Sequence, residues 1–203
     1  MKNNLSLFPM DYQKQLHKYR RWQDAQLTLM GRLLVKEGAT YFNERVDLKE
    51  LYFTEYNKPY FENNSIIFNI SHSGEFVVVA ITNDNCNIGI DIEKYKSINI
   101  QDFKGHMTPY EQHKVLNSEK DQIEFFRYWT QKEAVIKAHG NGLTIPLKSF
   151  EIRNNKTNLD SSTFFISEIM LKEEYACHVA SKKEIYKENI TVKKIDINKF
   201  TTT

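Results

Sequence analysis

Residues 87–94 read NIGIDIEK, and this stretch decides how the middle of the chain folds. Its isoleucines alternate with small or acidic residues, which is the period of a β-strand with one apolar face. The other face carries Asp91 and Glu93, about 6.6 Å apart along an ideal strand. Like charges this close repel each other, so the strand needs a partner for both carboxylates unless that face is simply solvated.

Further elements are predicted before this stretch. A helix is predicted over 10–37, and Gly38 is a plausible signal for its C-terminal end. A short strand near 49–53 follows. Two more strands, at 66–70 and 75–82, come directly before residues 87–93, and the short turns between the three favour antiparallel pairing.

The second half repeats this order of helix and then strands. Helices are predicted over 108–118 and 120–139, followed by strands near 148–153, 163–170, 175–181 and 191–196. The pattern predicts an α+β fold made of two similar halves, residues 1–94 and 95–203, with a linker near 94–101.

Composition narrows the classes of protein. The 203 residues are 40% hydrophobic, which is enough for a core, and the net charge of +2 is too mild to indicate nucleic-acid binding. The two cysteines form neither a disulfide framework nor a zinc spacing. With no signal peptide and no apolar run of about 20 residues, we expect a soluble, cytoplasmic protein without a membrane partner.

The helix over 125–143 places an acid where an apolar residue is expected. At 100° per residue, Glu133 falls in the same stripe as Phe126, Trp129 and Ile136. A glutamate in such a stripe needs a partner: either Lys137, one turn later, or a metal ion. Together with Asp91 and Glu93 it would complete an oxygen-only site suited to Mg²⁺.

Two further segments carry candidate anion-binding groups. Residues 68–76 read FNISHSGEF, where a strand ending in Ser71-His72-Ser73-Gly74 would offer an anion cradle, or form an ordinary polar hairpin turn. The first helix carries an excess of basic residues, which is either a solvated face or an attraction for phosphates.

Taken together, these segments resemble the Sfp-type 4′-phosphopantetheinyl transferases of the holo-[acyl/peptidyl-carrier-protein] synthase superfamily. The matching pieces are YNKPYF (56–61), FNISHSG (68–74), IGIDIEK (88–94) and WTQKEAVIKAHGNGL (129–143). The last two correspond to the family's blocks G-x-D-x-E and W-x-x-K-E-A-x-x-K-x-x-G-x-G-L. The resemblance implies two pseudo-duplicated halves, each with a long helix on antiparallel strands, a site in the cleft between them, and a monomer.

The resemblance also implies the chemistry. The substrates would be coenzyme A and an apo acyl- or peptidyl-carrier protein of fatty acid, polyketide or nonribosomal peptide biosynthesis. Asp91, Glu93 and Glu133 would bind Mg²⁺, with Mn²⁺ as an alternative ion. Glu133 would accept the proton of the carrier serine, directly or through a metal-bound water, and Lys137 would neutralise or protonate the departing phosphate. Lys132 points elsewhere on the helix and is a weaker candidate for orienting phosphates.

The resemblance further implies that His72 contacts the 3′-phosphate of coenzyme A, with Ser71 and Lys58 beside it. The sequence departs from the family at one position, because Leu27 stands where many relatives have an arginine for this phosphate. Lys14, Lys18, Arg20 and Arg21 are all candidates to replace it, and the sequence does not choose among them.

Docking of the carrier protein is predicted on the second half, around QDFKGHMTPYEQ (101–112). Phe103, Met107 and Tyr110 would form an apolar patch there, unless Phe103 and Met107 pack the loop onto the core. Two other functions stay open at this stage: a metal-dependent nuclease or phosphodiesterase, and a non-catalytic module that binds coenzyme A or a carrier.

Overall fold

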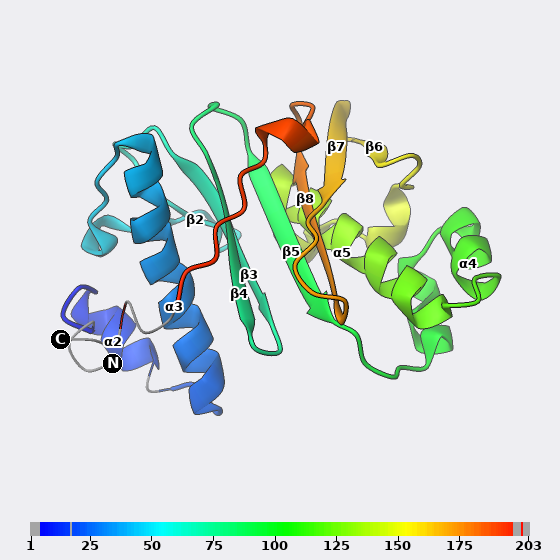
Figure 1. Ribbon diagram of the computed structural model, residues 1–203, viewed down its shortest axis with the longest axis horizontal. Helices are drawn as coiled ribbons and strands as arrows, with labels where there is room; N and C mark the ends of the chain where they lie inside the picture. The colour runs from blue at the N-terminus through cyan, green and yellow to red at the C-terminus, as the bar shows by residue number, and fades with distance from the viewer. Residues whose placement is uncertain (1–4, 17, 197–199, 201–203) are drawn as a thin grey trace.

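The computed structural model describes residues 5–16, 18–196 and 200. Two long helices lie on opposite sides of a central layer of strands (Figure 1). Helix α3 (Trp22–Ala39) packs on the hairpin of β3 (Ile67–Ser73) and β4 (Phe76–Thr82). Helix α5 (Asp121–His139) packs on β5 (Ile88–Lys94) and β8 (Tyr175–Ser181). The predicted α+β fold, with one long helix on antiparallel strands in each half, is confirmed.

The remaining elements extend these two layers. Strands β7 (Ser162–Glu168) and β6 (Lys156–Leu159) complete a four-stranded sheet in the order β5-β8-β7-β6. Helix α2 (Met10–Leu16) precedes α3, and helix α4 (Pro109–Leu116) lies beside α5. Strands β1 (Tyr52–Phe53) and β2 (Pro59–Tyr60) form a separate small ribbon. The strand expected near 49–53 is therefore shorter than predicted.

Strand β5 joins the two halves. It pairs antiparallel with β8, with Asp91 opposite His178, and not with β4 as the short turn between them predicted. The prediction was wrong because β8 offers β5 a backbone ladder over its whole length, whereas β3 meets β5 mainly through side chains. The proposed division at residue 94 stays a prediction, since β5 contacts both halves.

Helix α3 differs from the single helix predicted over 10–37. Arg21 has an extended backbone (φ −115°, ψ 126°), which separates α2 from α3. Gly38 lies inside α3, because that helix continues to Ala39. A Cβ at Gly38 would lie 2.2 Å from Ile81 Cδ1, and one at Gly31 would lie 2.7 Å from Ile70 Cγ2. These glycines therefore let the helix approach the hairpin closely.

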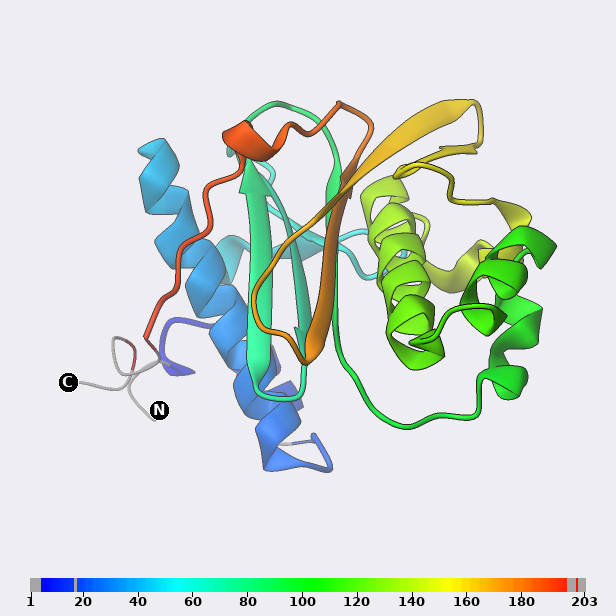
Figure 2. The same ribbon diagram turned by 45° about the vertical axis from the view of Figure 1, so that its right-hand side comes forward.

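Two predicted strands of the second half are not found. Residues 148–153 begin in a short 3₁₀ helix (Leu147–Ser149), and the next strand is β6. Residues 191–196, which the structure describes, form no strand. The segment 182–196 instead runs back towards α3, where Lys193 Nζ lies 4.6 Å from the ring centre of Tyr41 (Figures 1 and 2). Across the described residues, no helix has both the length and the apolarity to cross a membrane.

Candidate active site

The site is built around the buried carboxylate of Asp91 on β5. Its Oδ1 accepts a hydrogen bond from Ser71 Oγ (2.8 Å) and one from Lys137 Nζ (2.6 Å). Its Oδ2 is also buried, and it has no hydrogen-bond partner among the described residues. A buried carboxylate oxygen without a donor is costly, so this atom marks a place where a positive group would be strongly favoured.

Two more carboxylates share the electrostatic environment of Asp91. Burial and the negative charge of Asp91 together raise the pKa of Glu133 on α5. Burial is also the largest cause of a raised pKa at Glu93, where the hydrogen bond from Ser73 lowers it and Asp91 raises it. The three acids that the sequence singled out therefore repel one another, Asp91 and Glu93 along β5 and both of them with Glu133 on α5.

Lys137 pairs with Asp91 and not with Glu133. Its Nζ also lies 3.0 Å from Ser71 Oγ and 3.2 Å from the carbonyl oxygen of Ile90. An ion pair between Glu133 and Lys137, one turn apart on α5, would have explained the glutamate simply. The structure pairs Lys137 with Asp91 instead. Lys137 instead bridges α5, β3 and β5 at the centre of the site.

Gly89 explains why α5 can lie this close to β5. A Cβ at Gly89 would lie 2.2 Å from the carbonyl oxygen of Ala134 and 2.3 Å from the backbone nitrogen of Ala138. Any other residue would collide with the backbone of α5. The glycine of the G-x-D-x-E block thus positions Glu133 and Lys137 against Asp91.

The donors present fit a hard divalent cation. Oxygen ligands from carboxylates are those that Mg²⁺ prefers, and a dication would satisfy Asp91 Oδ2 and relieve the repulsion between the three acids. Within residues 5–16, 18–196 and 200, no three acidic, histidine or cysteine side chains already converge as a complete metal cage. The Lys137 ammonium supplies the positive charge next to Asp91 in this structure.

The Ser71–Gly74 segment differs from the predicted anion cradle. Ser71, His72 and Ser73 all belong to β3, so alternate side chains point to opposite faces. Ser71 faces Asp91 and Ser73 faces Glu93, whereas His72 is exposed. The strand therefore separates His72 from both serines, and the three residues do not form one cradle.

The side chain of Lys58 donates hydrogen bonds to backbone carbonyl groups of β5 and α5. Its Nζ donates to the carbonyl oxygens of Lys137 (2.8 Å) and Ile88 (3.3 Å), and burial lowers its pKa to about 8. It borders a cavity of about 490 Å³ that Tyr56, Pro59 and Asn141 also line, whereas Asp91, Glu93 and Glu133 do not. Lys58 thus links the start of β5 to the end of α5.

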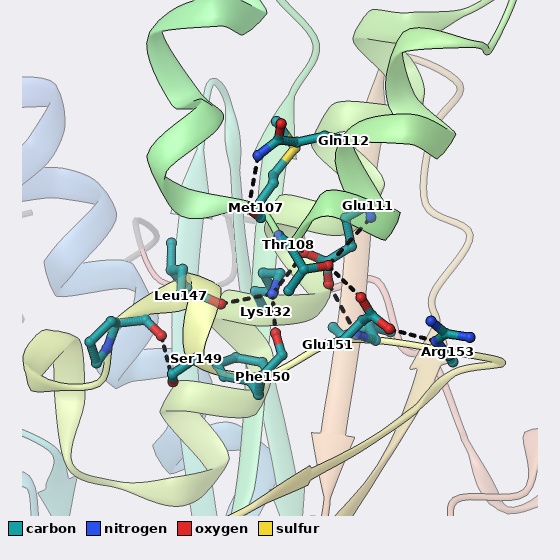
Figure 3. Close-up of polar contacts among 12 residues, drawn as sticks. Met107, Thr108, Glu111, Gln112, Lys132, Leu147, Ser149, Phe150, Glu151 and Arg153 are labelled. Atoms are coloured by element: carbon teal, nitrogen blue, oxygen red, sulfur yellow. Dashed lines mark hydrogen bonds and ion pairs between the residues drawn. The ribbon is translucent and has the colours of Figure 1, made fainter.

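Lys132, the lysine of the W-x-x-K-E-A block, lies in the interior. Its Nζ lies 2.9 Å from Glu111 Oε2 and donates to the carbonyl oxygens of Leu147 and Phe150. Figure 3 shows these residues around the lysine. Glu111 also accepts hydrogen bonds from the backbone of Thr108 and Ile152. The suggestion that Lys132 orients phosphates is therefore wrong for this chain, because all its contacts hold the second half together.

Sequence reasoning did not use Glu111, although a local signal was present. Thr108 and Glu111 form a capping box at the start of α4, a pattern readable as T-x-x-E followed by a helix. The sequence placed Ser73 in the predicted anion cradle and not beside Glu93, although polar residues at every second position of NISHS indicated a shared face of the strand.

One residue of the predicted docking patch is buried, and the other two are half-buried. Met107 is 5% exposed, and the ring of Phe103 lies 5.0 Å from that of Phe125 and 5.5 Å from that of Trp129. Both residues pack the 101–107 segment onto the core, as the alternative interpretation expected: Met107 is buried and Phe103 is half-buried. Tyr110 is half-buried under Arg153, whose guanidinium lies 4.2 Å from the centre of the tyrosine ring.

Both halves of the chain are similar to known proteins. Residues 87–190 match the family model described as the 4′-phosphopantetheinyl transferase superfamily, and residues 1–84 match the model of the 4′-phosphopantetheinyl transferase N-terminal region. Over 154 residues the chain is 34% identical to the 4′-phosphopantetheinyl transferase Sfp of Bacillus subtilis (strain 168), covering 73% of this chain and 67% of Sfp. It is 39% identical over 148 residues to the transferase gsp of Aneurinibacillus migulanus, covering 69% of this chain and 59% of gsp.

A solved structure, the holo-[acyl-carrier-protein] synthase of Thermotoga maritima, aligns with a TM-score of 0.38 and 14% identity, over 49% of this chain and 64% of that one. The family models and the sequence relatives show that this chain belongs to the 4′-phosphopantetheinyl transferase superfamily. Within that superfamily it is an Sfp-type 4′-phosphopantetheinyl transferase. The nuclease and the non-catalytic module find no support in these matches.

Proposed function

We propose that this protein moves the 4′-phosphopantetheine arm of coenzyme A onto a serine of an apo acyl- or peptidyl-carrier protein and releases adenosine 3′,5′-bisphosphate. The observation that carries the proposal is the Asp91 carboxylate, which has a bare buried oxygen, shares its environment with Glu93 and Glu133, and pairs with Lys137. Such a group of acids and one lysine suits phosphoryl transfer, where catalysis is mostly positioning and charge stabilisation.

Asp91, Glu93 and Glu133 would hold a Mg²⁺ ion, or Mn²⁺ in its place. When bound, the ion stabilises negative charge on the attacked phosphoryl group and on the leaving group. Asp91 would contribute through Oδ2, because Oδ1 is already engaged by Ser71 and Lys137.

Glu133 and Lys137 would act on protons and charge around the transfer. Glu133 on α5 feels the negative charge of Asp91, and it would accept the proton of the attacking serine. The Lys137 side chain is 27% exposed, so its ammonium can also face a bound phosphate. Its contact with Asp91 keeps the ammonium at the seam where the leaving group would form.

The 3′-phosphate of coenzyme A would be bound mainly by His72. His72 is exposed on the face of β3 opposite to Ser71, whereas Ser71 and Lys58 already have partners within the protein. Those two residues would therefore shape the site more than bind the phosphate. Arg20 and Arg21, which are exposed just before α3, are candidates for the role that Leu27 cannot fill, as are Lys14 and Lys18.

The carrier protein would dock on the second half, beside α4. Since Met107 and Phe103 are packed inwards, the contact would fall on Tyr110 and on Leu116, which is 48% exposed. Both residues belong to α4, so a carrier that binds this helix would lie next to α5.

Mass spectrometry of an apo carrier incubated with this protein, coenzyme A and Mg²⁺ tests the function directly. The expected result is a mass gain of one phosphopantetheine, which disappears when a chelator removes the metal. Asp91→Ala should abolish the gain in a folded protein, whereas the exposed acid Glu119 offers a control variant, Glu119→Ala, that should keep it. Failure of the wild-type protein to modify either an acyl or a peptidyl carrier would refute the proposal.

A further inference from the structure

The seam between β3 and β5 is held by side chains at every second position of β3. Asn69 Oδ1 accepts a hydrogen bond from the backbone N–H of Ile90 at 2.9 Å. Two residues later Ser71 donates to Asp91, and two residues further Ser73 donates to Glu93 Oε2 at 2.8 Å. One face of β3 thus contacts the strand that carries the two carboxylates.

Ser73 is itself held in place from both sides. Its hydroxyl oxygen accepts a hydrogen bond from the backbone N–H of Lys94 at 3.1 Å. The turn that follows lies against Tyr175, whose hydroxyl accepts a hydrogen bond from the N–H of Glu75 at 3.3 Å. Gly74 permits this approach, because it has a φ of +57° and a Cβ there would lie 2.6 Å from the Tyr175 hydroxyl.

A serine hydroxyl affects a carboxylate differently from a lysine. Lys137 compensates the charge of Asp91, whereas the neutral hydroxyl of Ser73 orients Glu93 without adding a positive charge next to it. The hydrogen bond engages Oε2, and no hydrogen bond to Oε1 is found among the described residues. Groups that orient a metal-binding carboxylate in this way typically contribute strongly to metal affinity.

We propose that Ser73 is a positioning residue that holds Glu93 ready to bind the divalent cation. The inference rests on the proposed function, because it assumes that Glu93 is a metal ligand. It adds a residue with no direct contact to the substrate or the metal, and it makes the hairpin of β3 and β4 part of the site. The turn at Gly74 and the ring of Tyr175 then serve to keep the hydroxyl in place.

The test is to measure Mn²⁺ affinity, in the presence of coenzyme A, from the electron paramagnetic resonance signal of free Mn²⁺. Ser73→Ala should weaken Mn²⁺ binding about tenfold, the usual cost of losing a partner of a metal ligand. The concentration of Mg²⁺ that half-saturates transfer should rise by a similar factor, while kcat at saturating Mg²⁺ stays near the wild-type value. Ser73→Thr keeps a hydroxyl and should restore most of the affinity.

Ser65 provides a matched control. Its hydroxyl also contacts a glutamate, Glu44 Oε1 at 2.5 Å, but outside the site, so Ser65→Ala should leave Mn²⁺ affinity unchanged. Should Ser73→Ala fold poorly, Ser73→Cys, with a weak donor of similar size, should still lose affinity. Unchanged Mn²⁺ affinity in folded Ser73→Ala or Ser73→Cys, or a loss of kcat that Mg²⁺ does not recover, would overturn the role of Ser73. Absence of transfer by the wild-type protein would instead overturn the proposed function.

Discussion

At the scale of single residues, the polar groups beneath α5 divide into those that the site uses and those that only support it. His178 lies opposite Asp91 in the ladder between β5 and β8, yet its ring is buried against α5. Its Nδ1 lies 2.7 Å from Thr130 Oγ1, and burial, with a smaller effect of Arg127, lowers its pKa to about 3. His178 is therefore neutral at ordinary pH, and its contacts with Thr130 and Gln131 support α5.

The pKa of His178 leads to a prediction about acid stability. An unfolded histidine titrates near 6.5, so between that value and about 3 the unfolded state binds the extra proton and the folded state does not. The free energy of unfolding should therefore fall as the pH falls through this range, by up to about 1.4 kcal/mol per pH unit from this residue. Urea unfolding without metal should show a flatter acid dependence for His178→Asn than for the wild type.

An exposed histidine supplies the control for this experiment. His113 lies on the surface of α4, so His113→Asn should keep the pH dependence of the wild type. If His178→Asn and the wild type lose stability equally on acidification, the buried ring is not the group that titrates.

At the scale of elements, the decisive contact is between α5 and β5. Lys137 reaches Asp91, and Glu133 comes within its electrostatic influence, because Gly89 lets the backbone of the helix lie against the strand. A similar device brings α3 onto its hairpin, where Gly31 and Gly38 face Ile70 and Ile81. At each long helix, the absence of a glycine side chain thus allows close contact between the helix and its strands.

Gly89→Ala should therefore damage both stability and activity. The added methyl group must push the backbone of α5 away, because rigid main-chain atoms lie only 2.2 Å and 2.3 Å from its position. Overpacking of this kind typically costs about 1–3 kcal/mol, and a shift of about 1 Å at the reacting groups can slow catalysis about 100-fold. Urea unfolding and the transfer rate measure the two effects.

Gly105→Ala is the matched control, because a Cβ at Gly105 would meet nothing within 4 Å. It should leave both the free energy of unfolding and the transfer rate close to those of the wild type. Wild-type transfer by Gly89→Ala would show that the spacing of α5 from β5 does not govern the site.

At the scale of the whole molecule, the contacts that β5 makes with both halves join the two halves into one unit. The β5 strand has its backbone partner in the second half and its side-chain partners on β3 in the first. Lys58 of the first half makes a further contact at the start of β5, where its ammonium donates to the carbonyl oxygens of Ile88 and Lys137. The site lies along this seam, so its geometry depends on how firmly the halves are joined.

Lys58→Met should loosen this junction even without substrate. The apolar side chain fills similar space but leaves two carbonyl oxygens without their donor, at a cost of about 1–3 kcal/mol in the free energy of unfolding. Lys49→Met, at an exposed lysine of the 3₁₀ helix Leu48–Glu50, should be nearly neutral. Equal urea midpoints for the two variants would mean that Lys58 does not tie the halves together.

Sequence alone determined the features that depend on a local period. The alternation in residues 87–94 predicted a strand with its acids on one face, and helical spacing predicted that Glu133 and Lys137 lie one turn apart on the same helix. Strand and helix periods are properties of the backbone over a few residues, so a short stretch is enough to reveal them. For the same reason the three acids could be named before their arrangement was known.

Only the tertiary structure decided which partner each of these groups has. In the fold, β5 pairs with β8, which follows more than 80 residues later in the chain. Lys137 pairs with Asp91 and not with Glu133, and Lys132 is buried against Glu111. Met107, which looked exposed along the chain, also became part of the core. These outcomes follow from competition between contacts far apart in the sequence, and their free energies depend on burial and on neighbours that no local pattern contains.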